Sequence, residues 1–197
     1  MIFAVNFQLN VSRRVLLSIY NSLIVPYITY GVCAWGNCAL TFQRKIVNLQ
    51  KRAAYALFIS VSLRNTPYPS FSNRIAFPYL AYFFRDCSYL LYDINRQTAP
   101  VSILNQLVKT SHIHNYRSRT RSVSSESFYV KFSRTDKMYA FFSRIGAQIW
   151  NFIPYSIKLL KRSSFRKKIK ELLLNFLRSE DDYVEVSCLI KLFNTLG

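Results

Sequence analysis

The sequence predicts a mainly α-helical fold: four to five helices, with an irregular basic segment of loops and short strands between them. Three observations support this prediction. Apolar residues recur with the period of an α-helix in several long stretches. Pro26, Pro78 and Pro100 stand at the ends of those stretches, where a proline is tolerated or ends a helix. Of the 197 residues, 51% are hydrophobic and 16% are aromatic, which is enough to form a core.

The first helix is expected to begin after Ser12, acting as N-cap, and to end near Val25, just before Pro26. Its buried side should be a stripe of apolar residues spaced four apart. The stripe consists of Val15, Ile19 and Leu23. The segment 27–35 that follows is rich in aromatic and β-branched residues, so local propensity predicts a strand there.

Two further helices are expected in the middle of the chain. One should run from Thr41 to about Ser60, with an apolar face formed by Ile46, Leu49, Ala53 and Leu57. The other should run from Pro78 to about Asn95, and its helical period is the clearest in the sequence. Its apolar residues are Leu80, Phe83, Phe84, Cys87, Leu90, Leu91 and Ile94. A short helix near 102–108 should follow.

The composition changes after Lys109, so we divide the chain into a helical domain, 1–108, and a basic C-terminal segment, 109–197. Residues 111–143 should be loop with short extended pieces, and 146–154 a short ordered segment around Trp150. Ser163 or Ser164 should cap a last long helix. Its apolar face is Phe165, Ile169, Leu172, Leu173 and Phe176. An acidic end follows, with a short final helix at 186–193.

The net charge of +18 indicates a polyanionic partner. Between Lys109 and Lys170 there are 15 lysines and arginines against two acids, with aromatic residues interleaved among them. Cations can follow a phosphate backbone and aromatic rings can stack on bases, so this composition favours nucleic acid. An anionic membrane surface is the second candidate.

The cysteines predict an intracellular location, nuclear or cytoplasmic, rather than secretion. They are Cys33, Cys38, Cys87 and Cys188, and no two of them form a C-x-x-C pair. We expect reduced, mostly buried thiols. A zinc site joining Cys33 and Cys38 to His112 and His114 is disfavoured, because structural zinc ligands are spaced more closely.

Paired carboxylates, which polymerases and nucleases need to hold Mg²⁺, occur together only at Glu180, Asp181 and Asp182. A polymerase metal site would need an aromatic residue two positions before the acid pair, on a tight hairpin. Ser179 stands there instead, after an expected helix. The acidic cluster therefore indicates a solvated helix end, not a catalytic centre.

A membrane span is an alternative for residues 15–43, which contain no charged side chain and are long enough to cross a bilayer. Against it, Asn21, Pro26 and Asn37 interrupt the apolar character of this segment. A small membrane protein anchored by this segment is therefore the less favoured hypothesis.

Six short motifs follow one another along the chain. They are LSIYNSLIVPYITYG at 17–31, AWGNC at 34–38, LQKRA at 49–53, HNYRSR at 114–119, GAQIWNFIP at 146–154 and SFRKKIK at 164–170. In this order they resemble the region after the catalytic palm in reverse transcriptases of non-LTR (LINE, jockey-like) retrotransposons. The resemblance covers about residues 15–177. Ser118 and Phe152 depart from the family pattern, which usually has Asn and Ser at these positions.

The resemblance implies that the chain is the thumb and C-terminal part of an RNA-directed DNA polymerase from a transposable element. The family's fingers, palm and endonuclease domain have no counterpart in this sequence. The palm carboxylates that bind Mg²⁺ are also absent. We therefore expect no cofactor in this chain and no activity from it alone.

A thumb grips the template–primer duplex through its backbone, so recognition should not depend on base sequence. The expected partners are an RNA–DNA hybrid or duplex, and the palm and fingers of a reverse transcriptase on another polypeptide. The cations expected to contact phosphates are Lys51, Arg52, Arg117, Arg119, Arg121, Arg166, Lys167 and Lys168. A transposon relic without function is a further alternative.

Overall fold

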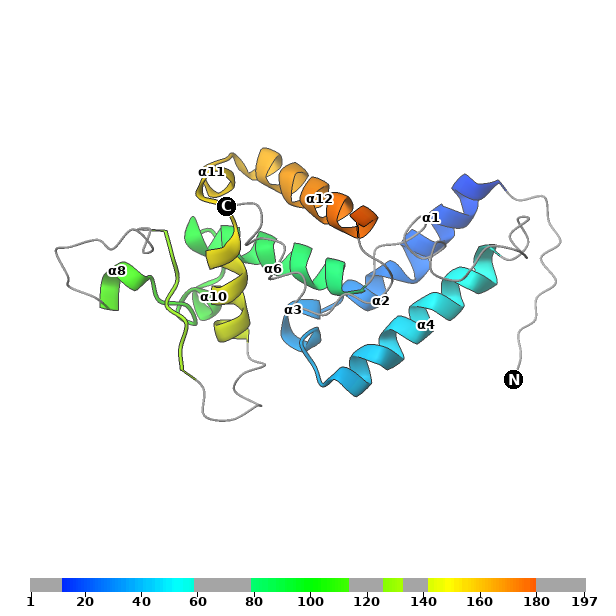
Figure 1. Cartoon of the computed structure of the whole chain (residues 1–197), viewed down its shortest axis with the longest axis horizontal. Helices are drawn as coiled ribbons and strands as arrows, with labels where there is room; N and C mark the ends of the chain where they lie inside the picture. Colours follow the sequence, from blue (N-terminus) through cyan, green and yellow to red (C-terminus); the bar gives the residue numbers. More distant parts are fainter. Residues whose placement is uncertain (1–11, 59–78, 114–125, 133–141, 180–197) are drawn as a thin grey trace.

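The computed structural model describes residues 12–58, 79–113, 126–132 and 142–179, and this part of the chain is mainly α-helical, as predicted (Figure 1). Its longer helices are α1 (Arg13–Leu23), α4 (Leu40–Phe58), α6 (Tyr79–Asn95), α10 (Phe142–Phe152) and α12 (Arg162–Ser179). No strand occurs within these ranges. A single antiparallel bridge pairs Lys109 with Phe128.

Short helices connect the long ones. They are α2 (Val25–Thr29), α3 (Val32–Trp35), α7 (Val101–Leu104), α8 (Thr110–Ile113) and α11 (Tyr155–Lys158). The short helix predicted near 102–108 corresponds to α7, which is shorter than predicted and begins earlier in the sequence. The last long helix begins at Arg162, so Ser163 and Ser164 lie in its first turn and do not precede it.

The strand predicted at 27–35 is wrong, because α2 and α3 occupy this segment. Pro26 lies in the first turn of α2, where its missing N–H costs nothing. The Thr29 hydroxyl donates to the Val25 carbonyl at 3.0 Å. Gly31 then adopts a φ of 62° and turns the chain into α3. Both helices pack on α6, and this packing outweighs the local β propensity.

The central element is α6, which contacts α2, α3, α4, α10 and α12. The predicted apolar face is confirmed: all its members are buried except Leu90, which is half-buried. Burial extends further round the helix, to Tyr79, Tyr82 and Ser88. The Ser88 hydroxyl is satisfied by the Phe84 carbonyl at 2.7 Å. A helix surrounded by partners in this way is apolar on most of its surface.

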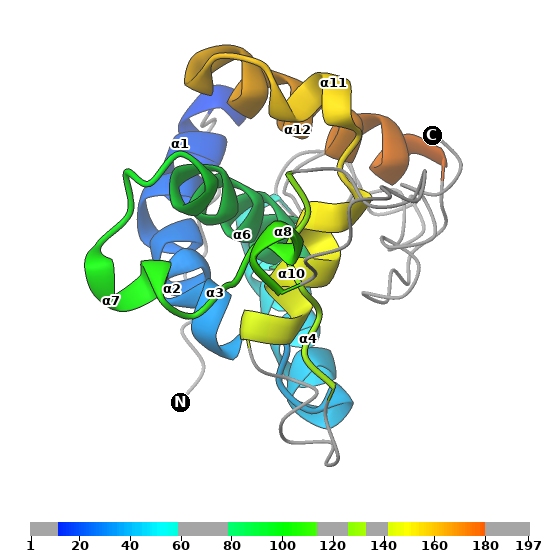
Figure 2. The ribbon, with the colours of Figure 1, turned by 90° about the vertical axis from the view of Figure 1, so that its left-hand side faces the viewer.

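Two further helices, α10 and α12, pack on α6 and complete the core (Figure 2). Trp150 from α10 and Phe165 from α12 are both fully buried, with ring centroids 6.2 Å apart. Phe165 also packs on Tyr92 of α6 at 4.5 Å. Residues on both sides of Lys109 therefore share one hydrophobic core.

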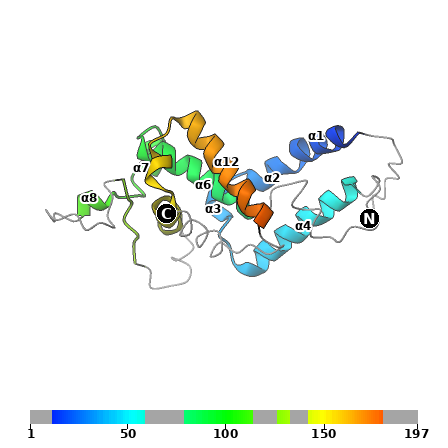
Figure 3. The same cartoon turned by 45° about the horizontal axis from the view of Figure 1, so that its top comes forward.

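Residues 12–58 form a projection that we call the arm. After α1 and α2 lead to α3 at its base, α4 returns alongside α1 (Figures 1 and 3). Leu16 and Tyr20 are the buried residues of α1. Gln50 of α4 is buried as well, and its amide oxygen accepts a hydrogen bond from the Tyr79 backbone N–H at 3.0 Å. This bond attaches the arm to the beginning of α6.

The buried stripe predicted for α1 is wrong. Val15 and Leu23 are exposed, whereas Leu16 and Tyr20, on the adjacent face, are buried. Leu49, predicted to lie on the buried face of α4, is also exposed. Both helices carry apolar residues on two faces, so periodicity alone does not identify the face that meets the core.

Several sequence-based predictions lie outside the described residues. They include most of the irregular basic segment, at 114–125 and 133–141, and the short helix at 186–193. The side chains of Leu57 and Phe176 also lie outside this part of the structure.

Candidate nucleic-acid interface

Cations on α4 share one broad face of the helix, which we call the α4 basic face. Its members are Arg44, Lys45, Lys51 and Arg52. This face points away from Gln50, which is the buried residue among the side chains of α4 that the structure describes. Lys51 is half-buried and the other three are exposed. From Arg44 to Arg52 the helix rises about 12 Å, so the face can reach more than one phosphate.

The arm contains no carboxylate to offset these cations. The first acid of the chain is Asp86, and nine lysines and arginines precede it. Each acid within the described ranges already pairs with a cation outside the arm. The pairs are Asp86 with Arg85 at 2.7 Å, Asp93 with Arg162 at 2.7 Å, Glu126 with Lys109 at 3.9 Å and Glu171 with Lys168 at 3.0 Å. The segment that forms the arm therefore has a net positive charge of its own.

The density of cations along the sequence does not identify the arm as a basic region, because that density is highest elsewhere, between Lys109 and Lys170. The arm has fewer cations, but it has no acids at all. The signal that identifies it is the absence of any acid before Asp86.

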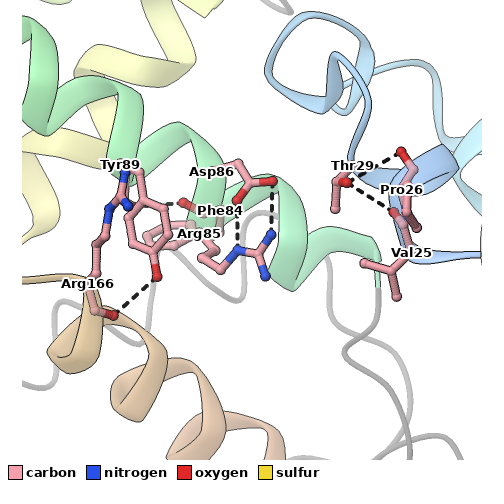
Figure 4. A network of polar contacts seen from close by, with 9 residues as sticks. Val25, Pro26, Thr29, Phe84, Arg85, Asp86, Tyr89 and Arg166 are labelled. Carbon is pink, nitrogen blue, oxygen red and sulfur yellow. Dashed lines mark hydrogen bonds and ion pairs between the residues drawn. The ribbon is translucent and has the colours of Figure 1, made fainter. Parts of the chain in front are cut away.

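On α12, Arg166 has a packing role. Its guanidinium lies over the Tyr89 ring of α6, 4.9 Å from the centroid, and the Tyr89 hydroxyl donates to the Arg166 carbonyl at 3.2 Å (Figure 4). Burial raises the pKa of Tyr89, so the hydroxyl stays protonated and can donate. One turn earlier, Arg162 pairs with Asp93. These contacts join α12 to α6. Because the Arg166 guanidinium packs on Tyr89, it is less available to bind a phosphate.

The other predicted contacts differ in their surroundings. Lys168 is half-buried and bonded to Glu171, whereas Lys167 is exposed. The structure places α12 along one side of α6 and α4 on another (Figures 1 and 2), so the two groups of cations stand on different helices. Arg117, Arg119 and Arg121 lie outside the described residues.

Both tryptophans have structural contacts. The Trp150 indole N–H donates to the Glu126 carbonyl at 2.7 Å from a fully buried position. Trp35 is half-buried, stacks on Tyr79 and donates to the Tyr30 carbonyl at 2.7 Å. The large aromatic residues exposed to solvent within the described ranges are instead Tyr27, Tyr30, Phe42, Phe132 and Tyr155.

Lys158 is a buried cation that no pattern in the sequence singles out. Its amine lies over the Trp150 ring, 5.3 Å from the centroid. Burial lowers the pKa of Lys158 to about 8, although nearby Glu126 opposes this shift. A large fraction of this lysine is therefore neutral just above physiological pH.

An exposed apolar stripe runs along α1 and α2, and we call it the outer stripe. Its members are Val15, Ile19, Leu23, Tyr27 and Tyr30, spaced three or four residues apart. Leu23 is 61% exposed, Tyr27 83% and Tyr30 85%, whereas Ile19 is half-buried. Exposed apolar side chains that recur along one face of a folded domain are typical of a surface that contacts another molecule.

The described residues contain no group of three His, Cys, Asp or Glu side chains that could hold a metal ion. His114, one member of the disfavoured zinc set, is outside this part of the chain. Within the same residues, no helix has the length and apolar character needed to cross a membrane. The uncharged stretch 15–43 is divided among α1, α2, α3 and the beginning of α4.

Comparison of the chain with family models, with curated proteins and with solved structures gave no match.

Proposed function

We propose that this chain is a non-catalytic, nucleic-acid-binding part of a non-LTR retrotransposon reverse transcriptase, equivalent to its thumb. The proposed ligand is the backbone of an RNA–DNA hybrid or duplex. The observation that carries this proposal is the arm, which presents the α4 basic face in a segment without a single acid. Such a surface attracts phosphates and releases their counterions on binding.

The chemistry of this surface favours contact with the backbone over the reading of bases. Lysine and arginine on an exposed helix face donate to phosphate oxygens, which every sequence presents in the same way. Lys167 on α12 supplies a further exposed cation of the predicted set. Binding is therefore proposed to be tolerant of sequence and strongly dependent on salt.

The outer stripe supports the view that the chain belongs to a larger enzyme. An independent domain normally covers an apolar stripe of this length, whereas a domain that packs against its neighbours leaves it open. The proposed neighbours are the palm and fingers of the polymerase, on the same or another polypeptide. The catalytic carboxylates would belong to that palm.

The proposal is tested by titrating a labelled RNA–DNA hybrid with the whole chain over a series of salt concentrations. The logarithm of the binding constant should fall linearly with the logarithm of the salt concentration. Replacing Lys45 and Arg52 with glutamine should weaken binding to every sequence and reduce the slope by about 0.9 for each phosphate that is no longer neutralised. The same replacement of Arg96 is the matched control, since Arg96 is an exposed cation outside the arm and α12.

A binding constant that does not change with salt would contradict backbone binding. An equal weakening in the Arg96 variant would contradict the assignment to α4. Thermal unfolding addresses the remaining alternative, a relic without function. A cooperative transition is expected from the shared core, whereas its absence would favour the relic.

A further inference from the structure

Two apolar side chains of α4 lie exposed beside the cations of this helix. Phe42 is 57% exposed and Leu49 is 63% exposed. They share a sector of the helix surface about 80° wide with two members of the α4 basic face, because successive residues are turned by about 100°. We call these four residues, Phe42, Lys45, Leu49 and Arg52, the α4 ridge. The Lys45 amine lies over the Phe42 ring, 5.5 Å from the centroid.

The composition of the α4 ridge restricts what can cover it. A phosphate backbone pairs with lysine and arginine, but it buries neither Phe42 nor Leu49. A purely apolar surface would bury those two side chains and would take two cations out of water without a partner, at a cost in free energy. A ligand that satisfies the whole ridge therefore presents acidic groups and apolar side chains together.

The end of α12 is directed toward the arm. The first turn of α12 pairs with Asp93, near the end of α6, and Arg166 packs on Tyr89, one turn earlier in α6. The two helices therefore run antiparallel, and the last turn of α12 lies toward the beginning of α6. There the Tyr79 N–H donates to Gln50 of α4. Figures 1 and 3 show α12 running from α11 toward the arm in this way.

Residues 180–197, which we call the acidic tail, follow α12 directly and lie outside the described residues. Their composition complements the α4 ridge. The tail has a single cation, Lys191, and its acids are Glu180, Asp181, Asp182 and Glu185. Behind the acids come apolar residues three or four positions apart, the spacing of one side of a helix, which the sequence predicts at 186–193. They are Val186, Leu189, Ile190 and Phe193.

We propose that the acidic tail docks on the α4 ridge of its own chain. Its carboxylates pair with Lys45 and Arg52, and its apolar residues cover Phe42 and Leu49. An extended chain spans about 3.3 Å per residue, so the tail is long enough to pass round a helix about 10 Å in diameter.

The consequence for binding rests on the proposed function. The docked tail occupies Lys45 and Arg52, which a nucleic-acid backbone also needs. The tail therefore acts as a polyanion that belongs to the chain itself, and a hybrid binds only to the fraction of molecules in which the ridge is open.

The cations of α12 are nearer to the tail in sequence, but they complement it less well. Arg166 is packed on Tyr89, and Lys168 is bonded to Glu171. Among the described side chains of α12, the large hydrophobic residue that is exposed is Leu174, at 38%. The α4 ridge offers more apolar surface beside its cations.

The docking is tested with a carbodiimide, which couples a carboxylate directly to a lysine amine in contact with it. Treating the dilute whole chain and mapping peptides by mass spectrometry should give a link between Lys45 and an acid of the tail. Leu49→Ser should reduce the yield of this link severalfold, because the tail loses an apolar contact. Val101→Ser is the matched control, since it removes an exposed apolar side chain from α7 and should leave the yield unchanged. In a mixture with isotope-labelled chain, both linked peptides should carry the same label.

The competition is tested by titrating an RNA–DNA hybrid with a variant that carries both Leu189→Ser and Phe193→Ser. This variant keeps the net charge of the chain, so a change in affinity does not come from charge alone. Binding should strengthen about three- to tenfold, as expected if the ridge of the unsubstituted chain is open for about 10–30% of the time.

Two results would overturn the docking. One is a Lys45 link that joins two differently labelled molecules, and the other is a set of tail links confined to the lysines of α12. An unchanged affinity in the double variant would overturn the competition. The outcomes also separate this inference from the proposed function. A chain that forms the Lys45 link without binding the hybrid contradicts the proposed function and supports the docking. A chain that binds the hybrid with the expected salt dependence and forms no such link contradicts the docking alone.

Discussion

The Asn151 side chain makes two hydrogen bonds to the backbone of Phe128. Its side-chain amide donates to the Phe128 carbonyl at 2.8 Å, and its side-chain oxygen accepts from the Phe128 N–H at 2.9 Å. The neighbouring Trp150 bonds to the Glu126 carbonyl. Two adjacent residues of α10 thus secure the segment 126–132, which has no sheet partner beyond a single bridge within the described residues.

Replacing Asn151 with alanine should therefore lower the free energy of unfolding by about 1–3 kcal/mol, since two hydrogen bonds are removed together. Urea unfolding of the variant measures this change. Gln148→Ala is the control, because Gln148 lies on the same helix and is half-buried. Similar losses of stability in the two variants would mean that the bonds to Phe128 contribute little.

Lys158→Met should stabilise the protein at neutral pH. The pKa of Lys158 is lowered to about 8 in the folded state, whereas in the unfolded chain it is near 10.5. The unfolded state therefore binds more protons between these values, and wild-type stability should rise as the pH increases from about 8 to 10.5. Below pH 8 the full cost of burying the charge remains.

Unfolding temperatures of wild type and Lys158→Met, compared at pH 7 and at pH 9.5, measure this effect. The advantage of the variant should be larger at pH 7 and shrink at pH 9.5. Using the difference between the two proteins cancels the titration of groups that they share. A difference that does not vary with pH would show that Lys158 titrates normally.

Substitutions at Arg166 and Lys167 should distinguish an effect on protein stability from an effect on nucleic-acid binding. Arg166→Ala removes a cation from the face of Tyr89 and should cost about 0.5–1 kcal/mol of stability. Lys167→Ala should leave the unfolding temperature unchanged and weaken binding of an RNA–DNA hybrid. Thermal unfolding and hybrid titration of both variants check this. A stability loss in Lys167→Ala equal to that in Arg166→Ala would contradict it.

Replacing both Tyr27 and Tyr30 with serine should leave the unfolding temperature unchanged and reduce self-association of the isolated chain. Both side chains are almost fully exposed, so they contribute little to the core. Size-exclusion chromatography at several concentrations measures the association. Leu16→Ser, on the buried face of α1, should destabilise the protein by contrast. A large stability loss in the tyrosine variant would mean that the outer stripe is covered in solution.

The sequence predicted α6 correctly because every local signal in this segment indicated the same helix and the same buried face. The charged residues Arg85, Asp86 and Asp93 lie on one side of the helix, so the helical period leaves Leu80, Phe84 and Cys87 on the other. The core side of α12 was equally clear, because lysines and arginines occupy the remaining surface and leave Phe165 and Ile169 on a single face.

The arm could not be predicted in the same way. On α1, two adjacent faces are apolar, and the choice between Val15 and Leu16 depends on where α4 lies. At 27–35, residues with strand propensity had no strand to pair with among the described residues, so the backbone satisfied its hydrogen bonds locally in α2 and α3. The role of Arg166 depends on Tyr89, a residue 77 positions away. Contacts of that range are not encoded in local periodicity.

The central place of α6 also sets an order of assembly during synthesis. A ribosome that has translated as far as residue 58 has completed the arm but not the helix to which Gln50 attaches it. That helix in turn remains partly uncovered until α10 and α12 emerge, because both pack on it. Domains generally fold as units as they leave the ribosome, and transiently exposed apolar surface favours aggregation. The nascent chain should therefore depend on chaperones from the emergence of α6 until α12 is complete.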